Sequence, residues 1–283
     1  MSTKILVTGA TGQLGSAVVK ALTHRGFEVK AASTNPAKVS AGKRVAAVKM
    51  DYTDPATFDE AFKGVDRLFL IALPLDPDAP EKLRPIIDKA KTVGVNHIVF
   101  NSALGVDHNE QAPLRIIERY LMGSGVNYTI LRPNFFMENF ATGFAAPMIK
   151  AQGGIFLAAG DGKTSFISTG DIAEAVAAAF AEKHYGKEYN LTGPQALDHV
   201  EVAAIVGEAA GRQVTYHSLT EDEMLKAVRE SGVPEGSAQY LALLYSLVRA
   251  HLMAAVTDGV MEVTGRKPKG FREFAQEHRQ VWK

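Results

Sequence analysis

The chain has 283 residues, a formal charge of zero, 46% hydrophobic and 22% charged residues, and no cysteine. This composition is typical of a globular protein, either one large domain or a core with a smaller lobe. It excludes disulfides, thiolate catalysis and cysteine-ligated zinc, and the absence of a basic tail argues against nucleic-acid binding. No apolar run is long enough to span a bilayer, and the first strand begins so near Met1 that no signal peptide is expected. We therefore expect a cytoplasmic protein without a membrane partner.

Three glycines near the start form the most informative motif. The apolar run Ile5–Val7 predicts a buried parallel strand, and apolar residues at helical spacing begin at Leu14. Between them, the first glycine permits a tight turn, the second lets a pyrophosphate approach the backbone, and the third lets helix and sheet pack closely. The helix start adds free N–H groups and the positive end of the helix dipole. The expected dinucleotide contacts are Gly9, Thr11, Gly12, Gln13, Leu14 and Gly15.

Strand-like and helix-like segments then alternate with short connections. Strands are expected at 27–32, 45–49, 66–73, 96–100 and 126–131, with helices that include 81–92 and 112–122. This alternation predicts an α/β fold with a doubly wound parallel sheet of the Rossmann type. Ligands of such sheets bind outside the carboxyl ends of the strands, where Ser33, Leu73, Ser102 and Arg132 are expected.

The end of the second strand bears on the choice of cofactor. An NAD-binding protein usually carries Asp or Glu there for the ribose 2′-hydroxyl, but positions 29–50 contain no acidic residue. The basic residues of this stretch are Lys30, Lys38, Lys43, Arg44 and Lys49. The pattern favours NADP over NAD, with Ser33, Thr34, Asn35 and Lys38 meeting the 2′-phosphate, although a solvated basic loop would show the same pattern.

Further dinucleotide contacts are expected at the following strand ends. Asp51 and Tyr52 follow the third strand and either lie beside the adenine or form only a turn. On the nicotinamide side we expect Leu73, Pro74, Asn101, Pro133, Asn134, Phe135 and Phe136, although the two aromatic rings can equally belong to a core.

The pattern changes beyond Pro133. Loop residues and an aromatic segment lead to a helix at 171–181 and a last strand at 189–191, and helices follow near 200–210, 221–230 and 234–248. We expect a dinucleotide-binding core at 1–134, to which 166–193 returns, and a smaller, mostly helical substrate lobe within 135–283. The apolar helix 240–248 covers the substrate cavity, contacts a second copy in a homodimer, or lies in the core of the lobe.

Several segments resemble one known family. Thr8–Gly15 is similar to the cofactor loop of atypical short-chain dehydrogenases, and Ile116–Leu121, Ser124–Asn139, Gly160–Lys163 and Asp171–Ala173 resemble the NmrA-like branch of that family. The resemblance runs along almost the whole chain. It implies a Rossmann fold and NAD(P) binding, in a branch whose members include reductases of quinones and triphenylmethane dyes and non-catalytic, redox-sensing regulators.

One feature of standard short-chain dehydrogenases is missing. Those enzymes reduce carbonyls with a Tyr-x-x-x-Lys pair, but no tyrosine here has a lysine four residues later. Acceptors such as quinones need less protonation by the enzyme, so the sequence favours an NADPH-dependent reductase of a flat, conjugated acceptor, without flavin. The alternative is an NAD(P)-binding regulator without turnover. Two residues are candidates for catalysis. Ser102 resembles the active-site serine of the family, although it can equally form only a turn, and His108 is a candidate proton donor, although it can also be an exposed loop residue. No histidine spacing indicates a metal site.

Overall fold

Seven parallel strands form the central sheet of the protein, whose computed structural model describes residues 3–40 and 42–283. Their order across the sheet is β3-β2-β1-β4-β5-β6-β8. The bounds are β1 (Lys4–Val7), β2 (Glu28–Ser33), β3 (Val45–Lys49), β4 (Arg67–Ile71), β5 (His97–Asn101), β6 (Asn127–Pro133) and β8 (Lys187–Leu191). The order reverses direction at β1, so the chain runs outward to β3 on one side and to β8 on the other. This is the doubly wound arrangement that the alternation predicts.

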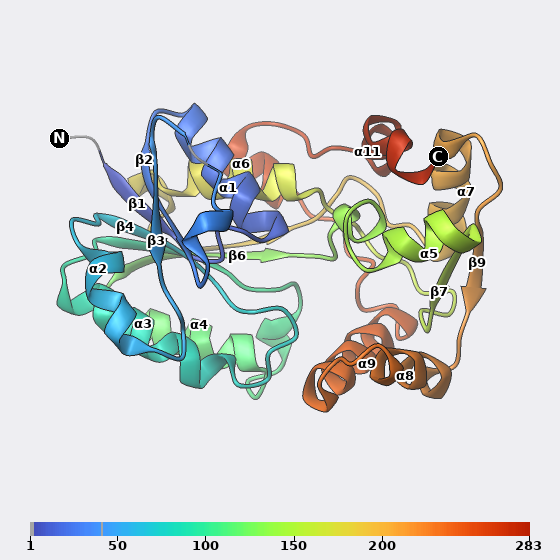
Figure 1. Ribbon diagram of the computed structural model, residues 1–283, viewed down its shortest axis with the longest axis horizontal. Helices are drawn as coiled ribbons and strands as arrows, with labels where there is room; N and C mark the ends of the chain where they lie inside the picture. Colours follow the sequence, from blue (N-terminus) through green and yellow to red (C-terminus); the bar gives the residue numbers. More distant parts are fainter. Residues whose placement is uncertain (1–2, 41) are drawn as a thin grey trace.

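Helices cover both faces of this sheet (Figure 1). On one face α1 (Gln13–His24) packs beside α6 (Thr169–Ala179), and α10 (Gly259–Thr264) lies against α6. The other face carries α2 (Phe58–Phe62), α3 (Ala79–Thr92) and α4 (Pro113–Gly123). Successive residues of a strand therefore enter different cores, as Leu6 and Val7 do. Each fully buried aliphatic side chain contributes roughly 1.5–3 kcal/mol, which explains why the middle residues of these central strands are apolar.

The second half of the chain builds a smaller unit beside the carboxyl ends of the strands. It contains α5 (Ala145–Gln152), β7 (Gly154–Leu157), α7 (His199–Ala210), β9 (Thr215–Ser218), α8 (Glu221–Glu230), α9 (Glu235–Arg249) and α11 (Phe271–His278). Strands β7 and β9 pair in parallel as a separate two-stranded sheet. The apolar residues of these elements share one core. Trp282 closes it, fully buried, with its indole N–H donating to the carbonyl of Phe140 at 2.7 Å.

The structure corrects some expected boundaries. The strand expected at 66–73 ends at Ile71, so Leu73 lies in the following loop with 48% of its surface exposed. The mostly helical description of the second half omitted the pair β7 and β9, whose four-residue strands are too short to show a period. Helix α6 begins after Ser168, whose hydroxyl accepts from the backbone N–H of Asp171 at 3.0 Å. In the part of the chain that the structure describes, no helix meets the length and hydropathy needed to cross a membrane.

Candidate functional site

The glycine-rich loop lies at the carboxyl end of β1, in the middle of the sheet. Gly9 has a φ of +62°, which favours glycine, and a Cβ there would lie 3.0 Å from the side chain of Ile71. At Gly15 a Cβ would lie 2.0 Å from the carbonyl oxygen of Gly9. Only glycine fits at position 15, because the first turn of α1 packs directly on the turn that leaves β1.

The start of α1 is open to an anion. Its N-cap is Gly12, which offers no side-chain cap, and the first turn contains no acidic residue. Thr11, Gly12 and Gln13 are exposed, whereas Leu14 is buried in the core below them. The first N–H groups of a helix have no partner within it and carry its positive dipole end. These residues therefore fit a dinucleotide pyrophosphate, which needs bare main chain and positive potential.

The end of β2 adjoins this loop. The buried Ser33 hydroxyl lies 3.3 Å from the Thr11 hydroxyl and accepts from the backbone N–H of Asn35 at 3.1 Å. The Asn35 side chain in turn caps the short helix η1 (Pro36–Lys38). Thr34 and Lys38 are exposed beside it. All four residues that are expected to contact a 2′-phosphate thus lie together next to the glycine loop.

Three of the basic residues that favoured NADP lie elsewhere. The Lys30 ammonium donates to the carbonyls of Glu60 and Lys63 at the end of α2, and burial lowers its pKa. Arg44 pairs with Glu28 at 3.0 Å. Both residues, with Lys43, line a depression at the amino ends of the strands, on the edge opposite the glycine loop. Their contribution to the NADP argument was wrong, because residue counts do not tell which edge of a sheet a side chain reaches.

A different lysine stands at the correct edge. Lys49 ends β3, is exposed, and is in register with Ser33 of β2. Side chains in register point to the same face of a parallel sheet. Lys49 was counted among the basic residues of the stretch but given no contact. The alternation within the expected strand, combined with its pairing to the second strand, is the signal that distinguishes it from Lys30, Lys43 and Arg44.

Asp51 and Tyr52 are engaged within the protein. Asp51 Oδ1 accepts from the backbone N–H and the hydroxyl of Thr53, at 2.9 and 2.7 Å, and these bonds lower its pKa. The Tyr52 hydroxyl donates to the carbonyl of Ile71 at 2.7 Å, and burial raises its pKa. The turn that the sequence offered as the alternative is therefore present, and the phenol supports the end of β4. Leu73 and Pro74 are exposed in the loop that follows.

Two buried polar groups without partners mark the end of β5. Ser102 is 3% exposed, and its backbone N–H donates to the carbonyl of Leu131 at 2.8 Å. Its Oγ and the Oδ1 of Asn101 have no hydrogen-bond partner among the described residues. Leaving such atoms unpaired costs about 1–3 kcal/mol each, which indicates a partner outside the chain. These atoms fit polar groups of a ligand bound at the carboxyl edge.

The segment after β6 fastens the two halves of the molecule together. The side-chain amide of Asn134 donates to the Ser165 hydroxyl and the Met253 carbonyl, both at 2.8 Å, and its oxygen accepts from the N–H of Phe135. Its amide hydrogens are therefore occupied within the protein, and its backbone N–H donates to the Leu191 carbonyl at 3.0 Å. Pro133 is buried as the last residue of β6. Phe135 and Phe136 are half-buried, and Phe135 lies 5.8 Å from the Tyr245 ring, centroid to centroid.

Two further features bear on proton transfer, namely His108 and the buried face of α4. His108 is exposed in the short helix η3 (Val106–His108), so the expected loop histidine is the better interpretation of it. The tyrosine of α4, Tyr120, donates to Asp88 of α3 at 2.7 Å. The buried positions of α4 near β6 hold Arg115 and Glu118 instead of a tyrosine and lysine. No proton relay of the standard type is therefore built on this helix.

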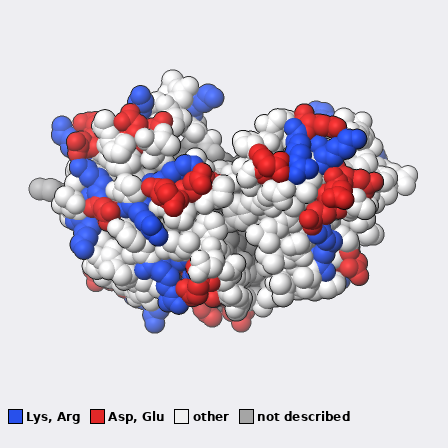
Figure 2. All heavy atoms as spheres, turned by 90° about the horizontal axis from the view of Figure 1, so that it is seen from below, with Lys and Arg blue, Asp and Glu red and all other residues white. Residues whose placement is uncertain are grey.

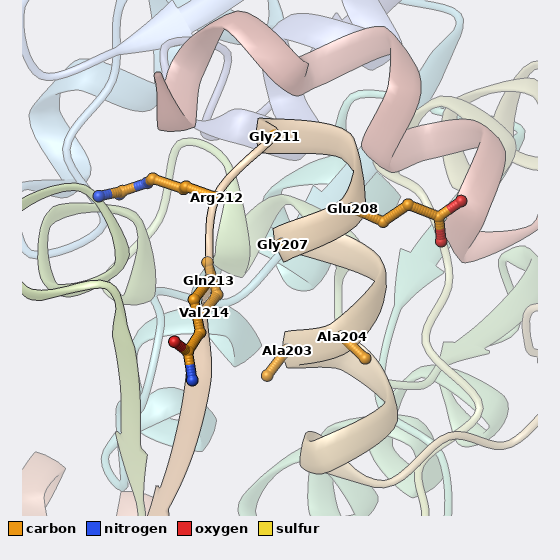
Figure 3. Close-up of a pocket in the computed structure, with 8 residues that line it drawn as sticks. All are labelled: Ala203, Ala204, Gly207, Glu208, Gly211, Arg212, Gln213 and Val214. Atoms are coloured by element: carbon orange, nitrogen blue, oxygen red, sulfur yellow. The ribbon is translucent and has the colours of Figure 1, made fainter.

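Two hollows of the molecule remain to be described. Figure 2 shows a furrow between the half that contains the sheet and the half that contains α5, α7, α8 and α9. A separate depression of about 530 Å³ lies at the end of α7, away from the glycine loop (Figure 3). Its two charged side chains, Glu208 and Arg212, point in opposite directions and bind elsewhere, to Arg272 and to carbonyls of α5. Nothing in it converges on a ligand. Within residues 3–40 and 42–283, no His, Asp and Glu side chains are grouped as a metal site.

Comparison with known proteins gives consistent results along the whole chain. Residues 1–275 match the model of the NmrA-like family. An NAD(P)H azoreductase from Xenophilus azovorans is 36% identical, with 97% of each chain covered. The Prestalk A differentiation protein A of Dictyostelium discoideum is 37% identical, covering 96% of this chain and 91% of its own. The crystal structure of an Escherichia coli NADPH-dependent quinone oxidoreductase complexed with NADPH superposes with a TM-score of 0.83 at 31% identity, covering 97% and 99%. The chain belongs to the NmrA-like family.

Proposed function

We propose that this protein is an NADPH-dependent reductase that passes hydride directly to a quinone-like or other flat, conjugated acceptor, without flavin. One observation carries the proposal: the glycine loop and the start of α1 are open to a dinucleotide, while the helix next to Ser102 carries an Arg–Glu pair in place of a Tyr–Lys pair. Acceptors that are electron-poor need little proton donation from the enzyme. The names of the azoreductase and quinone oxidoreductase relatives support the same reaction class.

Different residues of the chain would bind the dinucleotide and the acceptor. The glycine loop and the N–H groups of α1 would hold the pyrophosphate, and the Ser102 hydroxyl would hydrogen-bond the nicotinamide end or the acceptor. A bound NADPH supplies the hydride. The protein's part is to place the two reactants together and to exclude water, with Phe135 offering an aromatic surface to a flat acceptor. We propose that residues 1–134, with 166–193, bind the dinucleotide, and that 135–283 mainly bind the acceptor.

Preference for NADPH rests on the end of β2. Ser33, Thr34 and Lys38 carry hydroxyls and a positive charge there, and Lys49 adds a second ammonium in register with Ser33. No carboxylate competes for the ribose within positions 29–50. A 2′-phosphate would gain charge-assisted hydrogen bonds at this edge, whereas a 2′-hydroxyl would gain only neutral ones.

The experiment is consumption of NADPH and of NADH against a panel of quinones, azo dyes and triphenylmethane dyes. We expect turnover with at least one class and a higher kcat/KM with NADPH. Tight dinucleotide binding without turnover of any acceptor would reject the reductase. That outcome would favour the second candidate, a dinucleotide-sensing regulator, for which the 37% identical relative named for differentiation gives a specific reason. Its own test is a partner protein whose affinity changes with the NADP/NADPH ratio.

A further inference from the structure

A buried arginine connects three carboxylates beneath the Ser102 loop. Arg132, the penultimate residue of β6, is 4% exposed. Its Nε donates to Oε1 and its Nη2 donates to Oε2 of Glu118 on α4, both at 2.8 Å, and Glu118 is fully buried. The same guanidinium contacts Glu188 of β8 and, from Nη1 at 3.3 Å, Oδ2 of Asp107. Burial opposes the charge, but these carboxylates raise the pKa of Arg132 above its ordinary value.

Asp107 belongs to the loop between β5 and α4 that starts at Ser102. Asn101 is in register with Leu131, so the next pair along the two strands is Ser102 and Arg132. Because side chains alternate, both point to the α4 face of the sheet. The loop continues along β6, with the Leu104 N–H donating to the Pro133 carbonyl at 3.0 Å. It then returns through Asp107 to the same arginine.

The far end of this loop is also held by ions. Glu110 accepts from Arg115 at 3.0 Å and from Arg119 at 2.8 and 2.9 Å, and both arginines lie on α4. Arg115 in turn donates to Glu118 at 2.8 Å. A continuous chain of charges therefore runs from the end of the loop, through α4, to Arg132 and Asp107. Asp107 is thus attached to β6, and Glu110 is attached to α4.

Asp107 also keeps one oxygen free. Its Oδ1 is buried and has no partner in the described part of the chain, and the same is true of the Ser102 hydroxyl on this face. An ion pair that served stability alone would be more favourable with both carboxylate oxygens paired or solvated. The Ser102 loop therefore carries two polar atoms that the described part of the protein leaves unpaired.

We propose that Asp107 is a positioning residue for the reductase site. Held by Arg132, it fixes the loop so that Ser102 meets the nicotinamide end of the dinucleotide. The nicotinamide end is assigned to β4, β5 and β6 because the adenosine end lies over β2 and β3 on the other side of the glycine loop. This inference rests on the proposed function for the identity of the ligand.

The test compares two matched variants. Asp107→Asn and Glu188→Gln each remove one negative charge beside Arg132 without a change in size, but only Asp107 is on the Ser102 loop. We expect Asp107→Asn to weaken NADPH binding about fivefold to tenfold, the value of about one hydrogen bond between neutral groups, because the loop no longer holds the Ser102 hydroxyl against the ligand, and to lower kcat by a similar factor. Binding of adenosine 2′,5′-bisphosphate, which lacks the nicotinamide end, should not change. Glu188→Gln should change neither affinity.

Other results would overturn the proposal. Equal losses for Asp107→Asn and Glu188→Gln, or equal losses of NADPH and of the bisphosphate, would show that the ionic cluster only stabilises the fold. If Asp107→Asn does not fold, Asp107→Glu keeps the charge, moves the loop by one methylene, and is expected to give the same contrast. If the wild-type protein binds NADPH without turnover, the reductase is rejected. The comparison of NADPH with adenosine 2′,5′-bisphosphate then still decides the role of Asp107. A wild-type protein that binds no dinucleotide rejects both.

Discussion

Replacing Ser102 by alanine should change stability and activity in opposite directions. The hydroxyl is buried and has no partner among the described residues, so the free protein carries its desolvation cost of about 1–3 kcal/mol without a compensating bond. Removing one oxygen leaves a small cavity that offsets part of this gain. We expect the free energy of unfolding to rise by about 1 kcal/mol, which corresponds to roughly 2 °C in Tm for a chain of this size. In the same variant, kcat/KM should fall about threefold to tenfold, the value of one lost hydrogen bond to ligand.

The assays are urea unfolding and steady-state reduction of the best acceptor. Ser168→Ala is the matched control, because its hydroxyl is equally buried but accepts from the Asp171 N–H at 3.0 Å and caps α6. That variant should lose about 1 kcal/mol of stability and keep its kinetics. If Ser102→Ala behaved like the control, destabilised and kinetically unchanged, the hydroxyl would have an internal partner and no role toward ligand.

Four further predictions concern other parts of the molecule. The Cβ of a Gly12→Ala variant would lie 3.3 Å from the nearest carbonyl oxygen, so the free energy of unfolding should change by less than about 0.5 kcal/mol. The same variant should weaken NADPH binding at least about tenfold, as measured by calorimetry. Gly15→Ala, whose Cβ would lie 2.0 Å from a carbonyl oxygen, should fail to fold stably. Thr34→Asp should lower the NADPH to NADH ratio of kcat/KM at least about tenfold with an unchanged Tm, since a carboxylate would repel the 2′-phosphate; an unchanged ratio would remove the end of β2 from cofactor choice. Asn134→Leu loses three internal hydrogen bonds and should cost about 2–4 kcal/mol in urea unfolding, with little change in dinucleotide affinity of the folded protein. Burial lowers the pKa of His97 to about 3, compared with roughly 6.5 in the unfolded chain. The stability that the neutral imidazole contributes is therefore complete above pH 6.5 and is lost as the pH falls toward 3. A His97→Gln variant should show a flatter decline of the urea midpoint between these two pH values.

The sheet could be predicted from the sequence because its information is local. Each central strand is a short apolar run, and each helix shows its own period, so β3 is found at its observed bounds, Val45–Lys49. Strand β9 was missed because Thr215–Ser218 contains no apolar run, and it exists through its pairing with β7 rather than through its own composition. Short strands of this kind are decided by tertiary contacts.

The same distinction applies to the site. The glycine loop is contiguous, so its proposed role can be predicted from twelve residues of sequence, from Lys4 to Gly15. The ionic cluster joins residues 107, 118, 132 and 188, whose sequence separation hides their contact. The basic residues Lys30 and Arg44 were counted in favour of NADP for a related reason: the direction of a long side chain along the sheet depends on the carbonyls it can reach. Composition counts such groups without locating them.

The late return of the chain to its own sheet has a consequence for synthesis. Helix α6 covers α1, with Ile172 and Val176 in the same core as Leu14 and Val18, and β8 completes the sheet beside β6. A nascent chain that ends before residue 169 therefore exposes the apolar side of α1 and an open strand edge. The half that contains the sheet can mature only after β8, which ends at Leu191, has left the ribosome, and truncated translation products should aggregate or be degraded.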